Sequence, residues 1–432
     1  MLGFMGVDVA GPSSAELFEG SSVIGRRRRR WRRWWRRTHL VVGLTVGILM
    51  AVVFATGSAL VAGYSVDRWV NGDAHQRTSS GSATVPLERI VQTARREAPA
   101  EWGEPLRVSM PGQTTYGPEE TYEVYFEEPG ACLANACGAS GPGSTYDTKT
   151  HFLYLDPGTG EVLDSRSAPT GHLSLFLWEL HAHLLSGRAG LWLVGIAGLV
   201  LLVSAVTGLV LWWPLGRNGV GFRVRRRSSG DAFVYDLHNA AGFYVSLGLL
   251  VIALTGVVLT AKSLPPFDAA VESAIGARTG ARPSPARPLP GAQRLPVDEA
   301  VAIARRTFPD GEIAQVRLPS LDAYDGQRRT GVYHVFLTTP RTYGVEWIAQ
   351  VYVEPWSGRV LGSEDSRQDT VPQRVVHQWI ADIHDGTAGG PLGQVLVFLL
   401  GLLPAALLVT GWFMWRARRG RRLSRTPADR VA

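Results

Sequence analysis

Apolar and charged residues are separated along this chain of 432 residues. Four windows, 40–63, 191–213, 240–261 and 392–415, are almost wholly apolar and contain no charged residue. A helix of about 20 such residues crosses the roughly 30 Å of hydrocarbon in a bilayer. Core helices of soluble proteins are shorter and carry a polar face. The pattern therefore predicts four transmembrane helices and a polytopic α-helical membrane protein with its helices in a bundle.

The two long segments between these windows have the pattern of small α+β domains. In each, a stretch with apolar residues at helical spacing (87–96 and 297–308) precedes runs typical of strands. Predicted strands in the first segment are 106–110, 122–126, 152–155 and 161–163, and those in the second are 316–318, 332–338, 347–353 and 359–361. A Pro–Gly turn, 156–160 or 354–358, precedes the last strand of each set.

A histidine followed by a Thr-Gly step recurs at all four apolar windows. A histidine is followed 17 residues later by a Thr-Gly step at His39 and His238, and 26 residues later at His181 and His384. Two kinds of segment are thus each present twice, at a period of about 200 residues. A period of this length indicates a tandem internal repeat of span, outside domain and span.

These patterns predict ten segments. They are a disordered basic N-terminus (1–37), a first span (38–63), a first outside domain (64–180), a second span (181–214), a basic loop (215–236), a third span (237–261), a Pro-rich and extended linker (262–294), a second outside domain (295–383), a fourth span (384–415) and a basic tail (416–432).

Charge fixes the predicted orientation. The net charge is +7, but the arginines cluster at the edges of the apolar windows, within 26–37, 217–227 and 416–422. The positive-inside rule places these three clusters in the cytoplasm, with both termini inside and both long segments outside. A twin-arginine export signal or a nucleic-acid arm is the minority interpretation of 26–37. No cleavage site follows, so we expect the first span to be retained in the cytoplasmic membrane, and we expect membrane lipid and no nucleic acid as partners.

The two cysteines, Cys132 and Cys137, lie in the first outside segment. An oxidising compartment permits a disulfide there, which would close a small local loop. Two cysteines with no histidine pair nearby do not form a zinc site.

The order of these motifs resembles the PepSY-associated transmembrane helix family. The resemblance covers about residues 36 to 418. The matching motifs are Leu-His before the second and third spans, Ile-His-Asp-Gly at 383–386, the four Thr-Gly steps and the two turns. The family includes iron-regulated inner-membrane proteins and reductases of ferric siderophores. The resemblance implies two PepSY-like outside domains and, for members that reduce iron, haem b held by transmembrane histidines.

The predicted direction of each span assigns the four histidines to two pairs. His39 and His238 lie at the cytoplasmic ends of their spans, and His181 and His384 lie at the outer ends. Two neutral imidazoles from neighbouring helices can ligate haem iron from both sides, which leaves no open position and suits electron transfer. We therefore expect two bis-histidine haem b groups. Interface anchoring of the rings, or another metal, is the alternative.

The outer pair has a geometric difficulty and three competitors. His181 and His384 precede their apolar windows by 10 and 8 residues, which predicts a site at the outer surface. His183, His172 and His377 are possible alternate ligands, whereas His75, His151 and His334 are typical of surface or sheet positions.

Small and aromatic residues near the histidines have expected roles of their own. Glycines next to the ligands would leave room for a flat macrocycle; these are Gly43, Gly187, Gly242 and Gly386. The Thr-Gly steps are expected to support close helix packing, or otherwise to contact haem. Trp212, Trp213, Trp412 and Trp415 fit a cytoplasmic aromatic belt, with electron relay as the alternative.

Two functions of different classes fit the sequence. The first is a membrane reductase that moves electrons from an unknown donor to an outside acceptor, with a ferric chelate or siderophore implied by the resemblance. The second is a non-catalytic protein whose outside domains bind or regulate a peptide, protease or ligand. A transporter fits the parallel repeat, but no span is visibly broken. The sequence has no nucleotide-binding motif, so no hydride donor site is predicted.

Overall fold

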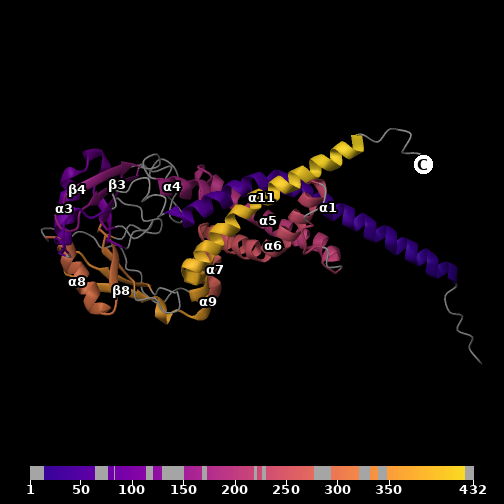
Figure 1. Cartoon of the computed structure of the whole chain (residues 1–432). Helices are drawn as coiled ribbons and strands as arrows, with labels where there is room; N and C mark the ends of the chain where they lie inside the picture. The colour runs from indigo at the N-terminus through magenta and orange to yellow at the C-terminus, as the bar shows by residue number, and fades with distance from the viewer. Residues whose placement is uncertain are drawn as a thin grey trace, which may run out of the picture. The chain divides into compact units, whose positions relative to one another are not determined.

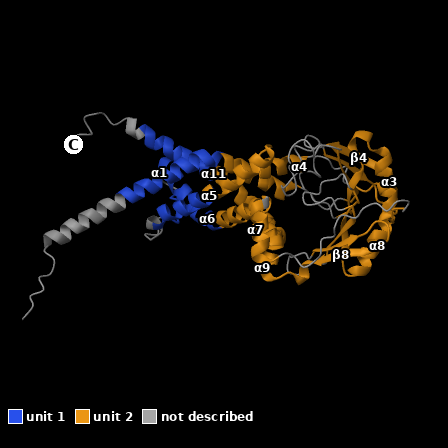
Figure 2. Cartoon of the chain, turned by 180° about the vertical axis from the view of Figure 1, so that it is seen from behind, with its two compact units in different colours: residues 1–48, 201–247, 407–432 blue, residues 49–200, 248–406 orange. Residues whose placement is uncertain are grey.

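The computed structural model describes residues 14–63, 76–81, 83–112, 120–128, 150–167, 173–217, 221–225, 230–276, 293–320, 331–338 and 348–423. These residues form two compact units (Figure 2). Unit 1 comprises 1–48, 201–247 and 407–432, and unit 2 comprises 49–200 and 248–406. Each of the four long helices contributes residues to both units.

Four helices confirm the predicted membrane spans. They are α1 (Ser14–Val61), α5 (Gly187–Arg217), α6 (Gly230–Lys262) and α11 (Gly390–Leu423) (Figure 1). All four are long and apolar enough to cross a bilayer, yet only 11–22% of the residues in their most apolar windows are buried. A surface of this kind is unfavourable in water and favourable in lipid, so the chain is a polytopic helical membrane protein.

Two segment predictions are wrong. Helix α1 already begins at Ser14, so residues 14–37 are helical and not a disordered tail. The segment predicted as an extended linker starts with helix α7 (Pro265–Ile275). Ala and Glu favour the helix in both places, Arg does so in α1, and prolines at the first positions of α7 preset its backbone.

The strands of both outside segments form one continuous antiparallel sheet, and not the two separate domains that the sequence predicts. The strand order is β4-β3-β2-β1-β5-β6-β7-β8. The first half holds β1 (Pro105–Ser109), β2 (Tyr122–Glu127), β3 (Thr150–Leu155) and β4 (Val162–Ser167). The second half holds β5 (Glu312–Arg317), β6 (Tyr333–Thr338), β7 (Ile348–Val353) and β8 (Val360–Asp365).

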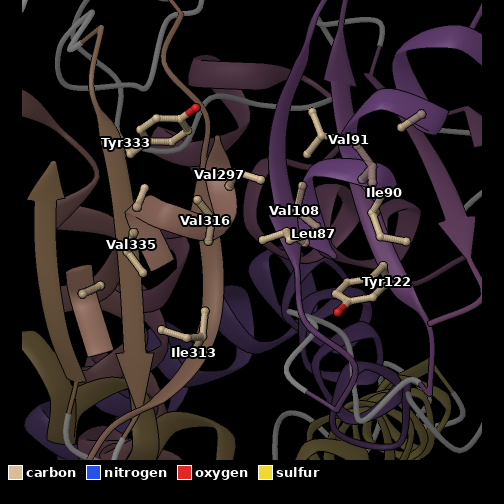
Figure 3. Packing of buried hydrophobic residues seen from close by; sticks show 14 of the residues in the cluster. Leu87, Ile90, Val91, Val108, Tyr122, Val297, Ile313, Val316, Tyr333 and Val335 are labelled. Carbon is tan, nitrogen blue, oxygen red and sulfur yellow. The ribbon is translucent and has the colours of Figure 1, made fainter. Parts of the chain in front are cut away.

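The two halves meet at β1 and β5, where Val108 lies opposite Val316. Each half alone would expose this strand as an unpaired edge, and pairing them satisfies the backbone groups of both. Helices α3 (Leu87–Glu97) and α8 (Val297–Thr307) lie on the same face of the sheet and build one shared core (Figures 1 and 3). Both halves contribute fully buried members, among them Ile90, Ala94, Val108, Val124, Ala300, Ala304, Val316 and Val335.

Each covering helix is capped by an acid from the other half. Asp298 of α8 accepts hydrogen bonds from the backbone N–H groups of Leu87 and Glu88, both at 2.8 Å. Glu88 in turn accepts one from the N–H of Val297 at 3.0 Å. The residues before both helices are prolines, which offer no side-chain cap, so the exchange satisfies N–H groups that a helix start leaves open.

Both predicted turns are present. In the first, the N–H of Gly160 donates to Asp156 O at 2.8 Å, and in the second the N–H of Gly358 donates to Glu354 O at 3.0 Å. The two glycines have φ values of 75° and 70°, which only glycine adopts without strain. In the first turn the Asp156 carboxylate also accepts bonds from Thr78, Ser79, Gly158 and Thr159, so the turn holds segment 76–81.

Candidate functional site: two histidine pairs

Within unit 1, His39 of α1 and His238 of α6 face each other. Their ring centres are 6.5 Å apart and the ring planes meet at 76°. Both rings are largely enclosed, because α5 packs behind His39 and α11 packs behind His238. We call this the first pair.

Within unit 2, His181 and His384 form the second pair. Their ring centres are 6.1 Å apart, with 52° between the planes. His181 lies on a single π-helical turn (Glu179–His183) after α4 (Leu173–Trp178), and His384 lies on α10 (Ile380–Asp385). The structure thus brings together the same two pairs that topology predicts.

The second pair contacts residues within the apolar windows of α1 and α6, although both histidines precede their own windows in the sequence. Behind His181 the chain turns through Leu184 and Leu185, both left-handed with φ of 51° and 53°, before α5 begins. Behind His384 it turns at Gly386, with φ of 84°. These breaks let both rings reach residues inside the apolar windows, because His181 contacts α1 and His384 contacts α6. A continuous helix would have carried the rings away from them.

Each histidine ring lies on a Thr-Gly step of a neighbouring span. A Cβ added to the step glycine would come within 2.8 Å of His181 at Gly57, 3.2 Å of His39 at Gly208, 3.0 Å of His384 at Gly256 and 3.5 Å of His238 at Gly411. The assignment is reciprocal. Helix α1 carries His39 and the step that contacts His181, and α6 carries His238 and the step that contacts His384. The steps that contact His39 and His238 lie on α5 and α11, the helices that follow His181 and His384 in the chain. The steps are therefore seats for imidazoles, a role that sequence reasoning missed. The available signal was the spacing between histidine and step, which is the same in the first and third spans and the same in the second and fourth.

Hydrogen bonds at Nδ1 fix the orientation of the rings. Backbone carbonyls accept from His39 (Ser204 O, 3.2 Å), His181 (Val53 O, 2.7 Å) and His384 (Ile252 O, 3.1 Å). For His238 the acceptor is the hydroxyl of Thr410 at 2.9 Å, which donates its own proton to Leu407 O. A carbonyl oxygen only accepts, so Nδ1 carries the proton and the neutral ring keeps a lone pair on Nε2.

That arrangement is the one a metal-binding histidine uses. Ligating imidazoles donate their second N–H to a carbonyl or hydroxyl, which fixes the tautomer. Among the described residues, no hydrogen bond to Nε2 occupies any of the four rings. Four lone pairs are therefore available as ligands.

The ring separations fit two ligands on opposite sides of one metal ion. An imidazole nitrogen binds a metal at about 2 Å, and the ring centre lies roughly 1.2 Å further back, so the centres of two such rings are about 6.4 Å apart. The observed values are 6.5 and 6.1 Å. One helical turn from His39 and His238, a Cβ at Gly43 would meet nothing within 4 Å and one at Gly242 would meet only Leu407 at 3.9 Å, so no side chain fills these two positions.

The other two glycines predicted to give such space have another role. Gly187 and Gly386 both have positive φ, and a Cβ at Gly386 would meet Gly393 O at 2.5 Å. They make the turns that separate the second pair from the following spans, and any side chain at Gly386 would obstruct that turn.

Comparison with known proteins assigns the family. The family model described as the PepSY-associated TM region matches residues 25–418, which is nearly the whole chain. The chain belongs to the PepSY-associated transmembrane family. No curated protein sequence matches it. Membership supports the membrane assignment and the resemblance drawn from the motifs.

In this family member the competing histidines have other partners. His183 is buried beside Glu179, with 3.3 Å between Nδ1 and the carboxylate. His377 contacts Glu272 at 3.2 Å and Lys262 at 3.5 Å. His151 and His334 belong to the sheet, where they stack on Trp102 and Tyr352. His75, His172, Cys132 and Cys137 lie outside the described residues.

The tryptophans predicted to form an aromatic belt differ in exposure. Trp213 and Trp412 are 65% and 39% exposed, as expected for an interface. Trp212 is buried, where it stacks on Phe243 with ring centres 3.9 Å apart and donates to Gly221 O at 3.1 Å. Trp212 thus fastens the loop 221–225 to unit 1.

An ion pair between an exposed arginine and a buried aspartate completes this attachment. Asp236, two residues before His238, accepts two bonds from the Arg225 guanidinium at 2.8 and 3.1 Å. Asp236 is 3% exposed and Arg225 is 63% exposed, so the pair fixes the start of α6 against the loop. Over the described residues, no group of three or more His, Cys, Asp or Glu side chains could hold a separate metal ion.

Proposed function

We propose that this member of the PepSY-associated transmembrane family is a membrane electron-transfer protein that binds haem b at both histidine pairs and acts as a reductase. The observation that supports this proposal is the presence of two histidine pairs, each with its rings spaced for one metal ion. Each ring is held by a hydrogen bond at Nδ1, which leaves Nε2 available. Interface anchors need neither paired rings nor fixed tautomers, so anchoring does not account for this geometry.

When bound between two imidazoles, haem iron exchanges single electrons and has no open position for oxygen. The chain would hold the group through the imidazole nitrogens of His39, His238, His181 and His384, each ring of which lies on a Thr-Gly step and is oriented through Nδ1. Fixing the ligands in both oxidation states keeps structural rearrangement on electron transfer small. The apolar spans around the rings exclude water and bulk ions.

Direction follows from the orientation that the arginines predict. We propose that the protein lies in the cytoplasmic membrane with both termini inside, so that the first pair faces an unknown cytoplasmic donor and the second pair faces the outside. Electrons then move from His39 and His238 towards His181 and His384.

We further propose that the acceptor is a ferric chelate of the siderophore class and that the two halves of the sheet are PepSY-like domains of a tandem repeat. The choice of a ferric chelate as the acceptor rests on the resemblance to the family. The mirrored order of helix and four strands in both halves supports the repeat. Reduction would loosen the iron, because Fe(II) is softer and less charged than Fe(III) and binds hard oxygen ligands less well.

The deciding experiment is a reduced-minus-oxidised absorption spectrum of the purified full chain in detergent, with haem counted per chain. We expect low-spin b-type bands and about two haems per chain. His238→Ala and His384→Ala should each remove one haem. His183→Ala is the matched control beside the second pair and should keep both.

Protein produced with ample haem that contains none would exclude this function. The remaining function would then be the non-catalytic one, in which the sheet binds or regulates an outside peptide, protease or ligand. Loss of a haem in His183→Ala but not in His181→Ala would instead reassign the ligand of the second pair.

A further inference from the structure

The exposed side of helix α7 carries no charged residue. It holds Phe267, Ala269, Ala270, Ser273 and Ala274, and Phe267 is 46% exposed. Both charged residues of the helix, Asp268 and Glu272, lie with Val271 and Ile275 on the half-buried side. A helix in water exposes its charges and buries its apolar side chains. The exposed side of α7 is therefore typical of a helix that faces lipid.

The position of α7 agrees with this. Two residues, Ser263 and the buried Leu264, separate it from the end of α6, and prolines occupy its first two positions. The Phe267 ring lies 5.9 Å from the ring of Trp192, which is 42% exposed and belongs to the candidate span of α5. The exposed side of α7 thus continues the lipid-facing surface of α5 at the end of a span, where aromatic rings prefer to lie.

The protein-facing side of α7 is fastened to the segment that leads to the second histidine pair. Glu272 contacts His377 at 3.2 Å, and Lys262, the last residue of α6, donates to Val376 O at 2.8 Å. At the other end of α7, the Gln373 amide donates to Gly276 O at 3.0 Å. These contacts attach α7 to the helical turns that precede His384.

We propose that α7 is an interfacial helix that lies in the lipid headgroup layer where α6 leaves the membrane, with Phe267 and Trp192 as its aromatic anchor. It holds the polypeptide before His384 at a fixed depth in the bilayer. Covalent attachment to α6 keeps a short helix of this kind at the membrane surface, where it would not stay as a free peptide. The proposal requires no cofactor and stands or falls independently of haem binding.

The test is the accessibility of a spin label on α7 in the full chain. Ala270→Cys and Ala274→Cys, each in a Cys132→Ser, Cys137→Ser background, are labelled with a nitroxide and reconstituted in phosphatidylcholine vesicles. Ile196→Cys on α5 is the lipid-facing control, and Arg306→Cys on α8 is the water-facing control. Both α7 labels should collide with oxygen, relative to a water-soluble nickel chelate, several-fold more often than the label at 306.

Two results would overturn the proposal. Collision ratios equal to those at 306 would place the exposed side of α7 in water. Protection from both oxygen and nickel, together with cross-linking between chains, would show that a second copy covers it. Since the labelled positions are exposed, the variants should elute as the parent does, and Ser273→Cys gives a third label on the same side.

Discussion

The glycine of each Thr-Gly step sets how close an imidazole comes to the helix that carries it. Closest is Gly57, where an added Cβ would lie 2.8 and 3.1 Å from two atoms of the His181 ring. At Gly411 the corresponding distance to His238 is 3.5 Å, an ordinary contact. The four steps look alike in sequence, but they differ in how much room remains.

Gly57→Ala should therefore displace His181, whereas Gly411→Ala should be tolerated. Overpacking of this kind costs about 1–3 kcal/mol of unfolding free energy. Thermal unfolding in detergent measures the difference, and in the haem-loaded protein Gly57→Ala should lower the haem count from two towards one. Equal behaviour of the two variants would show that the ring does not depend on the step glycine.

A second residue-scale feature is the Asp156 carboxylate. Burial alone would raise its pKa, but hydrogen bonds from Ser79, Thr159 and Thr78 outweigh burial and hold the pKa well below its usual value of 3.8. A carboxyl whose pKa is lowered on folding stabilises the folded state above its unfolded pKa and loses this contribution as the pH falls below it.

Asp156→Asn should accordingly lower stability at neutral pH by about 1–3 kcal/mol and flatten the loss of stability below about pH 4. Thermal unfolding from pH 7 to pH 3 measures both effects. Glu161→Gln, an exposed carboxyl in the same turn, is the control and should leave the pH profile unchanged.

At the scale of elements, the turn after α10 decides where the second pair lies. Gly386 combines a φ of 84° with a Cβ position only 2.5 Å from Gly393 O. Gly389, three residues later, has open space and no positive φ. The two glycines therefore separate the effect of the turn from the effect of adding a methyl group to this segment.

Gly386→Ala should move His384 off its seat and remove one haem, while Gly389→Ala should retain both. The strain and the clash together lower stability by about 1–3 kcal/mol. A visible spectrum and thermal unfolding are the measurements. Retention of both haems in Gly386→Ala would mean that the left-handed turn is not needed to place the ring.

Helices α3 and α8 depend on each other through their caps. Asp298→Ala leaves the N–H groups of Leu87 and Glu88 without their acceptor and should cost about 0.5–2 kcal/mol. Glu299→Ala changes an exposed acid in the same first turn and is the control. In a double-mutant cycle, Asp298→Ala and Glu88→Ala should be non-additive, because the two residues cap neighbouring helices. Simple additivity would contradict the coupling.

For the whole molecule, the features that sequence predicted are those with a local signature. The four uncharged windows lie in helices that are long and apolar enough to span a membrane, and the two Pro–Gly turns are present where they were predicted. Recurrence of histidines at matching ends of the spans was enough to name the pairs, because orientation in a membrane restricts which residues can meet. The charge pattern thus allowed a prediction of which histidines are paired, which the sequence of a soluble protein rarely permits.

What sequence could not predict depends on contacts between distant segments. Pairing of β1 with β5 leaves no mark in either strand, since an edge strand and a central strand have the same alternation. The left-handed turn at Leu184 and Leu185 uses residues that rarely adopt it, so propensity argues against it. The contact of His181 with Gly57 depends on this turn.

Joining of the sheet at β1 and β5 has a consequence for synthesis at the ribosome. Some 200 residues separate the two strands, so at about 5–20 residues per second the first half waits roughly 10–40 s for its partner. During this time two more spans must insert, β1 remains an open edge, and α3 lacks the cap from Asp298. The first half is therefore the part of the nascent chain most exposed to wrong pairing, and the cell must keep it from aggregating until the second half emerges.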